Sequence, residues 1–232
     1  RDWPLIEKYL KEADIPFRKV FTDKPKDAIR FSKEAINDGY RKIIAVGGDG
    51  TINEIVNGIF KQTDVEPHEV SLGVIMVGTG NDWGRMFDIP GDYHLAVDVV
   101  KKNKLFLQDV GKVNYNHGEK ILSRYFVNIA GLGFDAKVAQ KTNDAKDRGK
   151  SSKLSYFRAL LSSLMKYKAV DVNIQIDNKD GYNGDLFSLS VGIGKYSGGG
   201  MMQTPNAIVN DGLFDLTLIK DISKMKVIRS VK

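Results

Sequence analysis

The segment 43–53 constrains the fold of this chain more than any other part of its sequence. It reads IIAVGGDGTIN, an apolar run followed by a turn that has glycine at three of four positions. A continuous apolar run is typical of a strand buried on both faces of a parallel sheet. Apolar residues at helical spacing after the turn predict a helix from Thr51, and a helix N-terminus favours anions. The segment therefore predicts a nucleotide-phosphate site in which Asp49 handles a metal or a proton.

A second glycine loop follows the next predicted strand. Residues 72–77 are apolar, and the loop at 78–82 reads GTGND before a short helical stretch. No GxxxxGK[ST] pattern occurs in the sequence, which excludes an ordinary P-loop. A purely structural alternative exists for both loops, in which Asp49 caps its own helix and Asn81 and Asp82 cap the next one.

The order of predicted elements divides the chain into two domains. Through residue 105, helices alternate with strands, including a strand at 18–22, which predicts a parallel sheet covered on both faces. Beyond residue 105 the segments are mostly strand-like, and one long helix at roughly 151–168 interrupts them. The predicted fold is α/β, with an N-terminal nucleotide-binding domain over 1–105 and a C-terminal, mostly antiparallel β-sandwich over 106–232.

Composition narrows the class of protein. The chain has no cysteine, which excludes disulfides and cysteine catalysis and fits a cytoplasmic location. No apolar run reaches the roughly 20 residues that span a bilayer, and no signal peptide is visible. The net charge of +6 suits an anionic ligand or an anionic membrane surface, although many soluble proteins are equally basic.

Four motifs resemble, in order, those of the diacylglycerol kinase catalytic domain family, which includes sphingosine and ceramide kinases. The motifs are GGDGT at 47–51, GTGNDW at 78–83, DVG at 109–111 and PNAIVNDG at 205–212. The bacterial soluble branch is the most similar. The resemblance implies an ATP-dependent lipid kinase that phosphorylates a lipid hydroxyl, with a diacylglycerol-type acceptor and a lipid site in 106–232. That family's first phosphate loop and its late general base have no counterpart here, which implies trimming at both ends.

The resemblance also assigns roles to individual residues. ATP would contact the first glycine loop, the second loop and one earlier threonine, that is Thr22, Gly47, Gly48, Asp49, Gly50, Thr51, Ile52, Asn53 and Thr79. Asp49, Asp82 and Asp109 would be the catalytic carboxylates, in a water-mediated network around Mg²⁺ and the nucleotide. Carboxylate oxygens suit Mg²⁺.

A second, structural Mg²⁺ is implied at the fourth motif. Its ligands would be the Asp211 carboxylate and the backbone carbonyls of Ile208 and Leu213. From the residues alone, Asn-Asp-Gly at 210–212 predicts only a β-turn, and Asp109 is only an acid between a strand residue and a glycine.

Other interpretations stay open from the sequence. The GxGxxA pattern at 131–136 matches a dinucleotide fingerprint, but no acid lies about 20 residues on, so NAD(P) binding is not expected. An NAD kinase-like enzyme is the alternative within the same superfamily. A non-catalytic nucleotide or lipid sensor is the alternative outside the enzymes. The three histidines show no metal-ligand spacing.

The expected partners are ATP and a lipid alcohol. Residues 141–168 hold eight Lys or Arg, with apolar residues at helical spacing. Such a helix can lie on an anionic membrane, or it can pack against the protein with a solvated basic edge. A peripheral membrane contact and a homodimer are left open, and no nucleic-acid partner is expected. Nothing in the sequence identifies the acceptor lipid.

Overall fold

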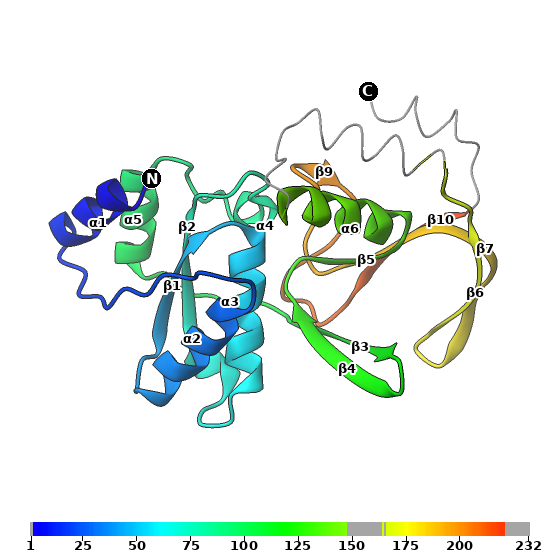
Figure 1. Cartoon of the computed structure of the whole chain (residues 1–232), viewed down its shortest axis with the longest axis horizontal. Helices are drawn as coiled ribbons and strands as arrows, with labels where there is room; N and C mark the ends of the chain where they lie inside the picture. The colour runs from blue at the N-terminus through cyan, green and yellow to red at the C-terminus, as the bar shows by residue number, and fades with distance from the viewer. Residues whose placement is uncertain (1, 148–163, 165, 221–232) are drawn as a thin grey trace. The chain divides into compact units, whose positions relative to one another are not determined.

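The computed structural model describes residues 2–147, 164 and 166–220 (Figure 1). The chain forms two compact units, one with Arg1–Ile129 and Ile193–Leu213 and the other with Ala130–Gly192 and Phe214–Lys232. Most of the helix expected at 151–168, including Lys153 and Arg158, lies outside the described residues. The division expected at residue 105 stays a prediction.

A parallel pair of strands forms the centre of the first unit. β1 (Lys42–Gly47) pairs with β2 (Ser71–Met76), so that Gly47, the last residue of β1, lies opposite Met76, the last residue of β2. The strands therefore end side by side, and the two glycine loops leave the sheet at the same edge. The predicted parallel sheet is confirmed.

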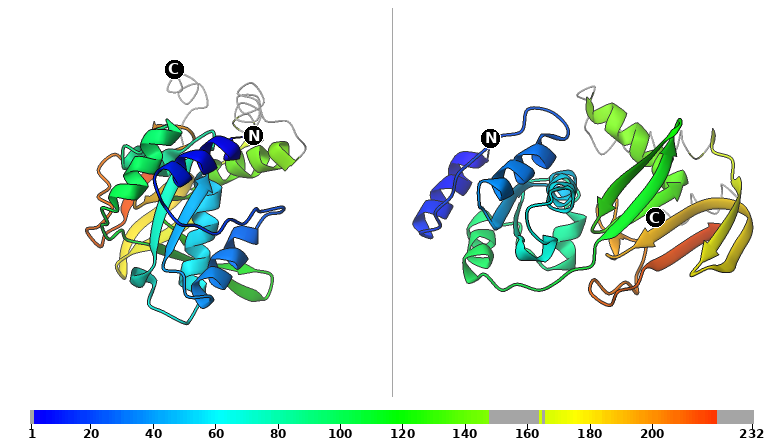
Figure 2. Two further views of the ribbon diagram at one scale, coloured as in Figure 1. Left: turned by 90° about the vertical axis from the view of Figure 1, so that its left-hand side faces the viewer. Right: turned by 90° about the horizontal axis from the view of Figure 1, so that it is seen from below.

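Helices cover both faces of this pair (Figures 1 and 2). α2 (Asp27–Asn37) and α3 (Asp49–Lys61) pack on the face that contains Ala45, and α1 (Trp3–Glu12) and α5 (Tyr93–Lys102) pack on the face that contains Ile44 and Val46. Successive strand residues point to opposite faces, so an uninterrupted apolar strand can supply two cores. The first core comprises Ala28, Ile36, Ala45, Ile52, Ile55, Val56, Ile59, Val70, Val74 and Val127. The second comprises Ile6, Leu10, Ile75, Ala96 and Val97.

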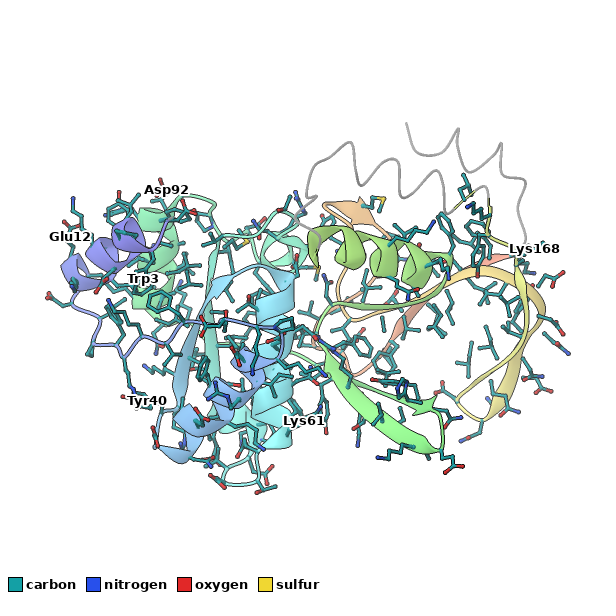
Figure 3. All side chains as sticks on the ribbon, viewed as in Figure 1. Trp3, Glu12, Tyr40, Lys61, Asp92 and Lys168 are labelled. Atoms are coloured by element: carbon teal, nitrogen blue, oxygen red, sulfur yellow. The ribbon has the colours of Figure 1, made fainter. Side chains whose placement is uncertain are left out.

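The strand expected at 18–22 is wrong. Residues 15–23 are described and contain no strand, because no neighbouring strand within the described chain offers them backbone partners. Aromatic packing holds the segment instead. The rings of Phe17 and Phe21 meet the ring of Trp3 edge-on, with centroid distances of 6.0 and 5.7 Å (Trp3 is labelled in Figure 3). Thr22 therefore lies in a loop.

The first unit also contains short elements outside the sheet. They are the 3₁₀ turn η1 (Pro67–Glu69), the helix α4 (Asp82–Met86), and the antiparallel hairpins β3 (Gly111–His117) with β4 (Lys120–Phe126) and β8 (Tyr196–Ser197) with β9 (Met201–Met202). The strand expected from residue 105 begins only at Gly111.

The second unit is an antiparallel sheet with one described helix. β7 (Lys179–Gly192) pairs antiparallel with β6 (Val170–Ile176) and with β10 (Asp215–Lys220), and β5 (Ile129–Gly133) borders β7. The predicted C-terminal antiparallel β domain is confirmed. The helix α6 (Phe134–Asp147) was not predicted, since its polar second half shows little apolar periodicity.

The glycine-rich pattern at 131–136 has a packing explanation in this unit. Gly133 has a φ of +76°, and a Cβ there would lie 2.6 Å from the carbonyl oxygen of Phe187. Phe134, Phe187 and Tyr167 stack in the adjacent core. The Tyr167 hydroxyl is buried without a hydrogen-bond partner among the described residues, and burial, together with the charge of Asp135, raises its pKa. The glycine thus permits β5, α6 and β7 to pack closely.

Candidate active site

The two glycine loops touch through their backbones. A Cβ on Gly48 would lie 2.9 Å from the Cα of Gly78, and a Cβ on Gly78 would lie 2.6 Å from the Cα of Gly48. The Val77 N–H donates to the carbonyl of Gly47 at 3.1 Å, which extends the parallel ladder to the loops. Only glycine permits this approach, because any side chain would overlap the facing loop. The loops therefore form one continuous surface at the carboxyl ends of the strands.

The first loop leads directly into a helix N-terminus. α3 begins at Asp49, two residues before the expected start at Thr51, and Gly48 is its N-cap. The N–H groups of Thr51 and Ile52 both donate to the Gly48 carbonyl, at 3.0 and 3.2 Å. The first N–H groups of a helix have no intrahelical acceptor. Together with the helix dipole they provide a site suited to phosphate oxygens.

Asp49 reaches across to the second loop. Its Oδ1 accepts a hydrogen bond from the N–H of Trp83 at 2.8 Å. Its Oδ2 faces Gly80, where an added Cβ would lie 3.1 Å from Asp49 Oδ2 and 3.3 Å from Asp82 Oδ2. The two carboxylates thus converge on Gly80. The alternative in which Asp49 caps its own helix is wrong, since α3 has no side-chain cap.

Asp82 is buried and holds a third glycine loop. It is only 5% exposed. Its Oδ2 accepts the N–H of Gly199 at 2.8 Å, and its Oδ1 accepts the N–H of Gly200 at 2.6 Å. Glycines 198–200 have φ values of +65°, +86° and +104°, which favour glycine at each position. This loop was not predicted from the sequence, although its three consecutive glycines are a visible signal.

Asn81 also has a role other than capping. It has a φ of +52°, and its Nδ2 donates to the carbonyl of Gly78 at 2.9 Å. Its Oδ1 is buried and has no hydrogen-bond partner in the described part of the chain. Thr79 is exposed and lines a cavity of about 410 Å³ together with Gly80, Asn81 and Arg85. The second loop thus presents a hydroxyl and a buried amide oxygen.

Trp83 and Gln108 form a series of hydrogen bonds that begins at the Asp49 carboxylate. The indole Nε1 of Trp83 donates to Oε1 of Gln108 at 2.9 Å, and Nε2 of Gln108 donates to the carbonyl of Val127 at 2.5 Å. Trp83 therefore donates its backbone N–H to Asp49 and its indole N–H to Gln108. No sequence signal distinguished Gln108.

Asp109 is hydrogen-bonded to the fourth motif. Its N–H donates to the carbonyl of Val209 at 2.8 Å, and its Oδ2 accepts the N–H of Gly212 at 2.7 Å. Asp211 forms the predicted turn, with its Oδ1 accepting the N–H of Leu213 at 3.0 Å. No group of three or more acidic or histidine side chains that could hold a metal occurs among the described residues. The structure brings Asp49 and Asp82 together at Gly80, and the place of Asp109 in the catalytic set stays a prediction.

The side chain of Asn53, expected to contact ATP, is committed to the β4 strand. Its Nδ2 donates to the carbonyl of Tyr125 at 3.0 Å, and its Oδ1 accepts two hydrogen bonds from Arg124 at 3.0 and 2.7 Å. Asn57, one turn later, pairs with both the N–H and the carbonyl of Tyr125. The two asparagines therefore bind α3 to the hairpin.

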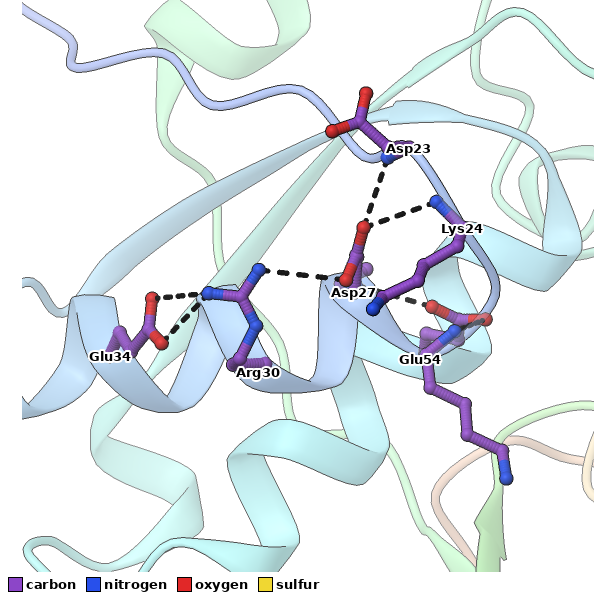
Figure 4. Close-up of polar contacts among 8 residues, drawn as sticks. Asp23, Lys24, Asp27, Arg30, Glu34 and Glu54 are labelled. Carbon is purple, nitrogen blue, oxygen red and sulfur yellow. Dashed lines mark hydrogen bonds and ion pairs between the residues drawn. The ribbon is translucent and has the colours of Figure 1, made fainter.

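Thr22 lies in a loop. A polar network fixes the residues that follow it, Asp23 and Lys24 (Figure 4). Asp27 accepts hydrogen bonds from the N–H groups of Asp23 and Lys24 at 3.0 and 3.1 Å, and these bonds lower the pKa of its carboxyl group. Glu54 of α3 accepts the N–H of Lys26 at 2.9 Å. Glu54 thus connects α3 to the segment after Thr22. Thr22 and Thr51 line one cavity of about 1220 Å³.

Comparison with known proteins identifies the family. Residues 1–113 match the diacylglycerol kinase catalytic domain, and residues 128–232 match the YegS C-terminal NAD kinase beta sandwich-like domain. Residues 1–113 therefore belong to the diacylglycerol kinase catalytic domain family, and residues 128–232 to the C-terminal domain named above. Among its curated relatives, a diacylglycerol kinase of Staphylococcus saprophyticus is 31% identical over 211 residues, and one of Staphylococcus epidermidis is 34% identical over the same length. Both alignments cover 91% of this chain.

The chain spans 65% and 62% of the length of those two relatives. A crystal structure of a putative diacylglycerol kinase from Bacillus anthracis superposes with a TM-score of 0.71, at 24% identity, covering 97% of this chain and 72% of that one. At that identity the likeness supports the fold alone. None of the described helices is both long and apolar enough to span a membrane.

Proposed function

We propose that this protein is an ATP-dependent lipid kinase that transfers the γ-phosphoryl group of ATP to the hydroxyl of a lipid alcohol, with a diacylglycerol-type acceptor. One observation carries the proposal: Asp49 and Asp82 converge on Gly80 at the point where two glycine loops touch. Family membership supplies the reaction class. In phosphoryl transfer a protein mainly positions phosphates and stabilises charge, and this arrangement suits that task.

The nucleotide would bind along the first loop and at Thr79. The N–H groups at the start of α3 would donate to phosphate oxygens, and the hydroxyls of Thr51, Thr79 and Thr22 would add donors. Gly47 lets Thr51 fold back over the strand end, because a Cβ on Gly47 would lie 2.5 Å from Thr51 Oγ1. Asn53 would contribute through its backbone, since its side chain holds the β4 strand.

The donor atoms around Gly80 fit Mg²⁺. This ion takes oxygen ligands and keeps several waters. Asp49 Oδ2 has no donor among the described residues, and Asn81 Oδ1 is buried without a partner. A bound Mg²⁺ would neutralise the charge that develops on the transferring phosphates. Asp49 and Asp82 would hold it directly or through water, and Asp109 would extend the network. A structural Mg²⁺ at Asp211 and the carbonyls of Ile208 and Leu213 is a second part of the proposal.

The remaining partners follow from the same proposal. A cytoplasmic enzyme that phosphorylates a lipid must reach a membrane, so a peripheral contact with an anionic surface is part of it. Association into a homodimer stays a prediction. An NAD kinase-like activity and a sensor without turnover are the competing functions.

The test is phosphate transfer from labelled ATP with Mg²⁺ to a panel of lipid alcohols and to NAD. Asp49→Asn should lower kcat by about 10²–10³, the range for loss of one transition-state charge partner. Its melting temperature should stay near that of the wild type, since Asp49 is not buried. Asp98→Asn, an exposed carboxylate on α5, is the matched control and should leave turnover unchanged. Transfer to NAD but to no lipid would reject the proposal, as would undiminished transfer by Asp49→Asn.

A further inference from the structure

The hairpin of residues 196–202, here called the glycine hairpin, is fixed by hydrogen bonds at its turn and at the start of its first strand. It consists of β8, glycines 198–200 and β9. Asp82 accepts two of its N–H groups, and Asn128 Nδ2 donates to the carbonyl of Tyr196 at 2.8 Å. The guanidinium of Arg85 lies 5.8 Å from the centre of the Tyr196 ring. The hairpin is thus attached to the same helix, α4, that carries a candidate catalytic carboxylate.

Its second strand exposes two large apolar side chains. Met201 is 43% exposed and Met202 is 55% exposed. Neighbouring residues on a strand point to opposite faces, so both faces of the hairpin present a thioether. β8 and β9 pair only with each other among the described strands. The hairpin has no acidic or basic residue, so its surface is uncharged, and Met201 and Met202 are its exposed large apolar side chains.

This chemistry suits a hydrocarbon chain. Methionine is unbranched and polarizable, and it adapts to apolar partners of irregular shape. If the protein is the lipid kinase proposed above, the acceptor hydroxyl must reach the carboxylates while the acyl chains continue away from them. The backbone nitrogens of Gly199 and Gly200 lie 2.8 and 2.6 Å from the carboxylate oxygens of Asp82. The methionines that follow these glycines are therefore suitably placed to contact the acyl chains.

We propose that Met201 and Met202 contact the acyl chains of the lipid substrate, and that Asp82, by holding the glycine hairpin, couples this contact to the position of the acceptor hydroxyl. This inference rests on the proposed function and assigns a substrate-recognition element to it. The occupant is the substrate's own acyl chain, and general insertion into a bilayer is the competing outcome of the test.

The kinetic test uses short-chain diacylglycerols of increasing acyl length, dispersed as monomers. The Met201→Ser/Met202→Ser variant should raise the KM for the lipid about tenfold or more, with a larger effect for longer chains, because each buried methylene adds to binding. The KM for ATP should not change. The Met201→Leu/Met202→Leu variant should restore the lipid KM, since leucine keeps the apolar volume. Ile121→Ser, on the β4 strand and 76% exposed, is the matched control and should leave the lipid KM unchanged.

Two kinetic outcomes would overturn the inference. One is an unchanged lipid KM in the double serine variant, with the dependence on acyl length retained. The other is normal turnover of dispersed lipid combined with weakened turnover on anionic vesicles, which would assign the methionines to the bilayer.

A second measurement does not depend on turnover. Dispersed short-chain diacylglycerol should slow the oxidation of Met201 and Met202 by peroxide, read by mass spectrometry, relative to Met86, which accepts the N–H of Lys195. Protection without phosphorylation of any lipid would reject the proposed function and keep the lipid contact. Phosphorylation without protection would reject only the contact.

Discussion

Two pairs of aspartates in the first unit differ in what holds them. Asp49 and Asp82 accept backbone N–H groups from segments 34 and 117 to 118 residues away, and they converge on Gly80. Asp109 and Asp211 meet at the fourth motif, where the half-buried Asp109 accepts the N–H of Gly212 and the exposed Asp211 accepts that of Leu213.

This contrast indicates which carboxylates can act together. Asp82 is buried and accepts two backbone N–H groups, so its direction is fixed and its interactions are screened little by water. Asp49 and Asp109 are both half-buried, so burial does not separate them, whereas Asp211 is exposed and its charge is screened. Because only Asp49 and Asp82 converge on Gly80, we expect substitutions in the first pair to affect chemistry strongly and substitutions in the second to affect it weakly.

The largest effect is expected for Asp82→Asn. The amide would place an NH₂ group against one of the two glycine N–H groups, so at least one hydrogen bond of the glycine hairpin is lost. Turnover should fall by about 10²–10³, and the free energy of unfolding should fall by about 1–3 kcal/mol, the cost of an unsatisfied buried group. Kinetics and thermal melting check it. A normal melting curve would contradict the anchoring role of Asp82.

Gly80→Ala should lower turnover by about tenfold, which is the next largest effect. Gly80 has no left-handed φ, so alanine fits its backbone, but the added methyl would lie 3.1 and 3.3 Å from the two carboxylate oxygens. Displacement of either carboxylate by a fraction of an ångström is enough to misplace a reacting group. The matched control is Gly91→Ala, which has no atom within 4 Å of its added Cβ. Equal turnover of both variants would show that the space around Gly80 is not used.

The sequence predicted the parts of the site that depend on local chemistry. The apolar strands and the glycines of both loops were sufficient to predict a parallel sheet with two loops, because strand burial and turn geometry are local properties. The convergence of Asp49 and Asp82 followed only from the family resemblance. The structure adds the N–H donors to the carboxylate oxygens of Asp49 and Asp82. These donors are 34 to 118 residues away in the sequence, so residue spacing within a motif does not predict them.

The errors of prediction have physical causes as well. The segment 18–22 has strand-like composition, but a strand needs a neighbouring strand, and Phe17 and Phe21 pack on Trp3 instead. The contact of Asn53 with the nucleotide stays a prediction. Its side chain donates to the carbonyl of Tyr125 on the β4 strand, which leaves its backbone for that contact.

Asp109→Asn tests the comparison directly and should have a smaller effect, a decrease in turnover of less than about tenfold. The substitution keeps an oxygen that can accept the N–H of Gly212 and removes only the charge at a distance from the pair. A decrease as large as that of Asp49→Asn would mean that the three aspartates act as one network.

The proposed Mg²⁺ site at Asp211 has a separate test. The melting temperature is measured with and without Mg²⁺ in the wild type and in Asp211→Asn, since a bound ion stabilises the folded state.

The smallest effect is expected at the polar network before α2, which involves no proposed catalytic group. Hydrogen bonds from Asp23 and Lys24 lower the pKa of Asp27 below its usual 3.8. A carboxyl group with a lowered folded-state pKa contributes stability above its unfolded pKa, and this contribution is lost as the pH falls through the folded-state value. Asp27→Asn should therefore lower the melting temperature by about a few degrees near pH 7, and the difference from the wild type should shrink below pH 4. Because Asp27 orders the segment next to Thr22, the variant should also raise the KM for ATP while kcat stays constant. A changed kcat with an unchanged KM would mean that this network acts with Asp49 and Asp82 and not through the binding of ATP.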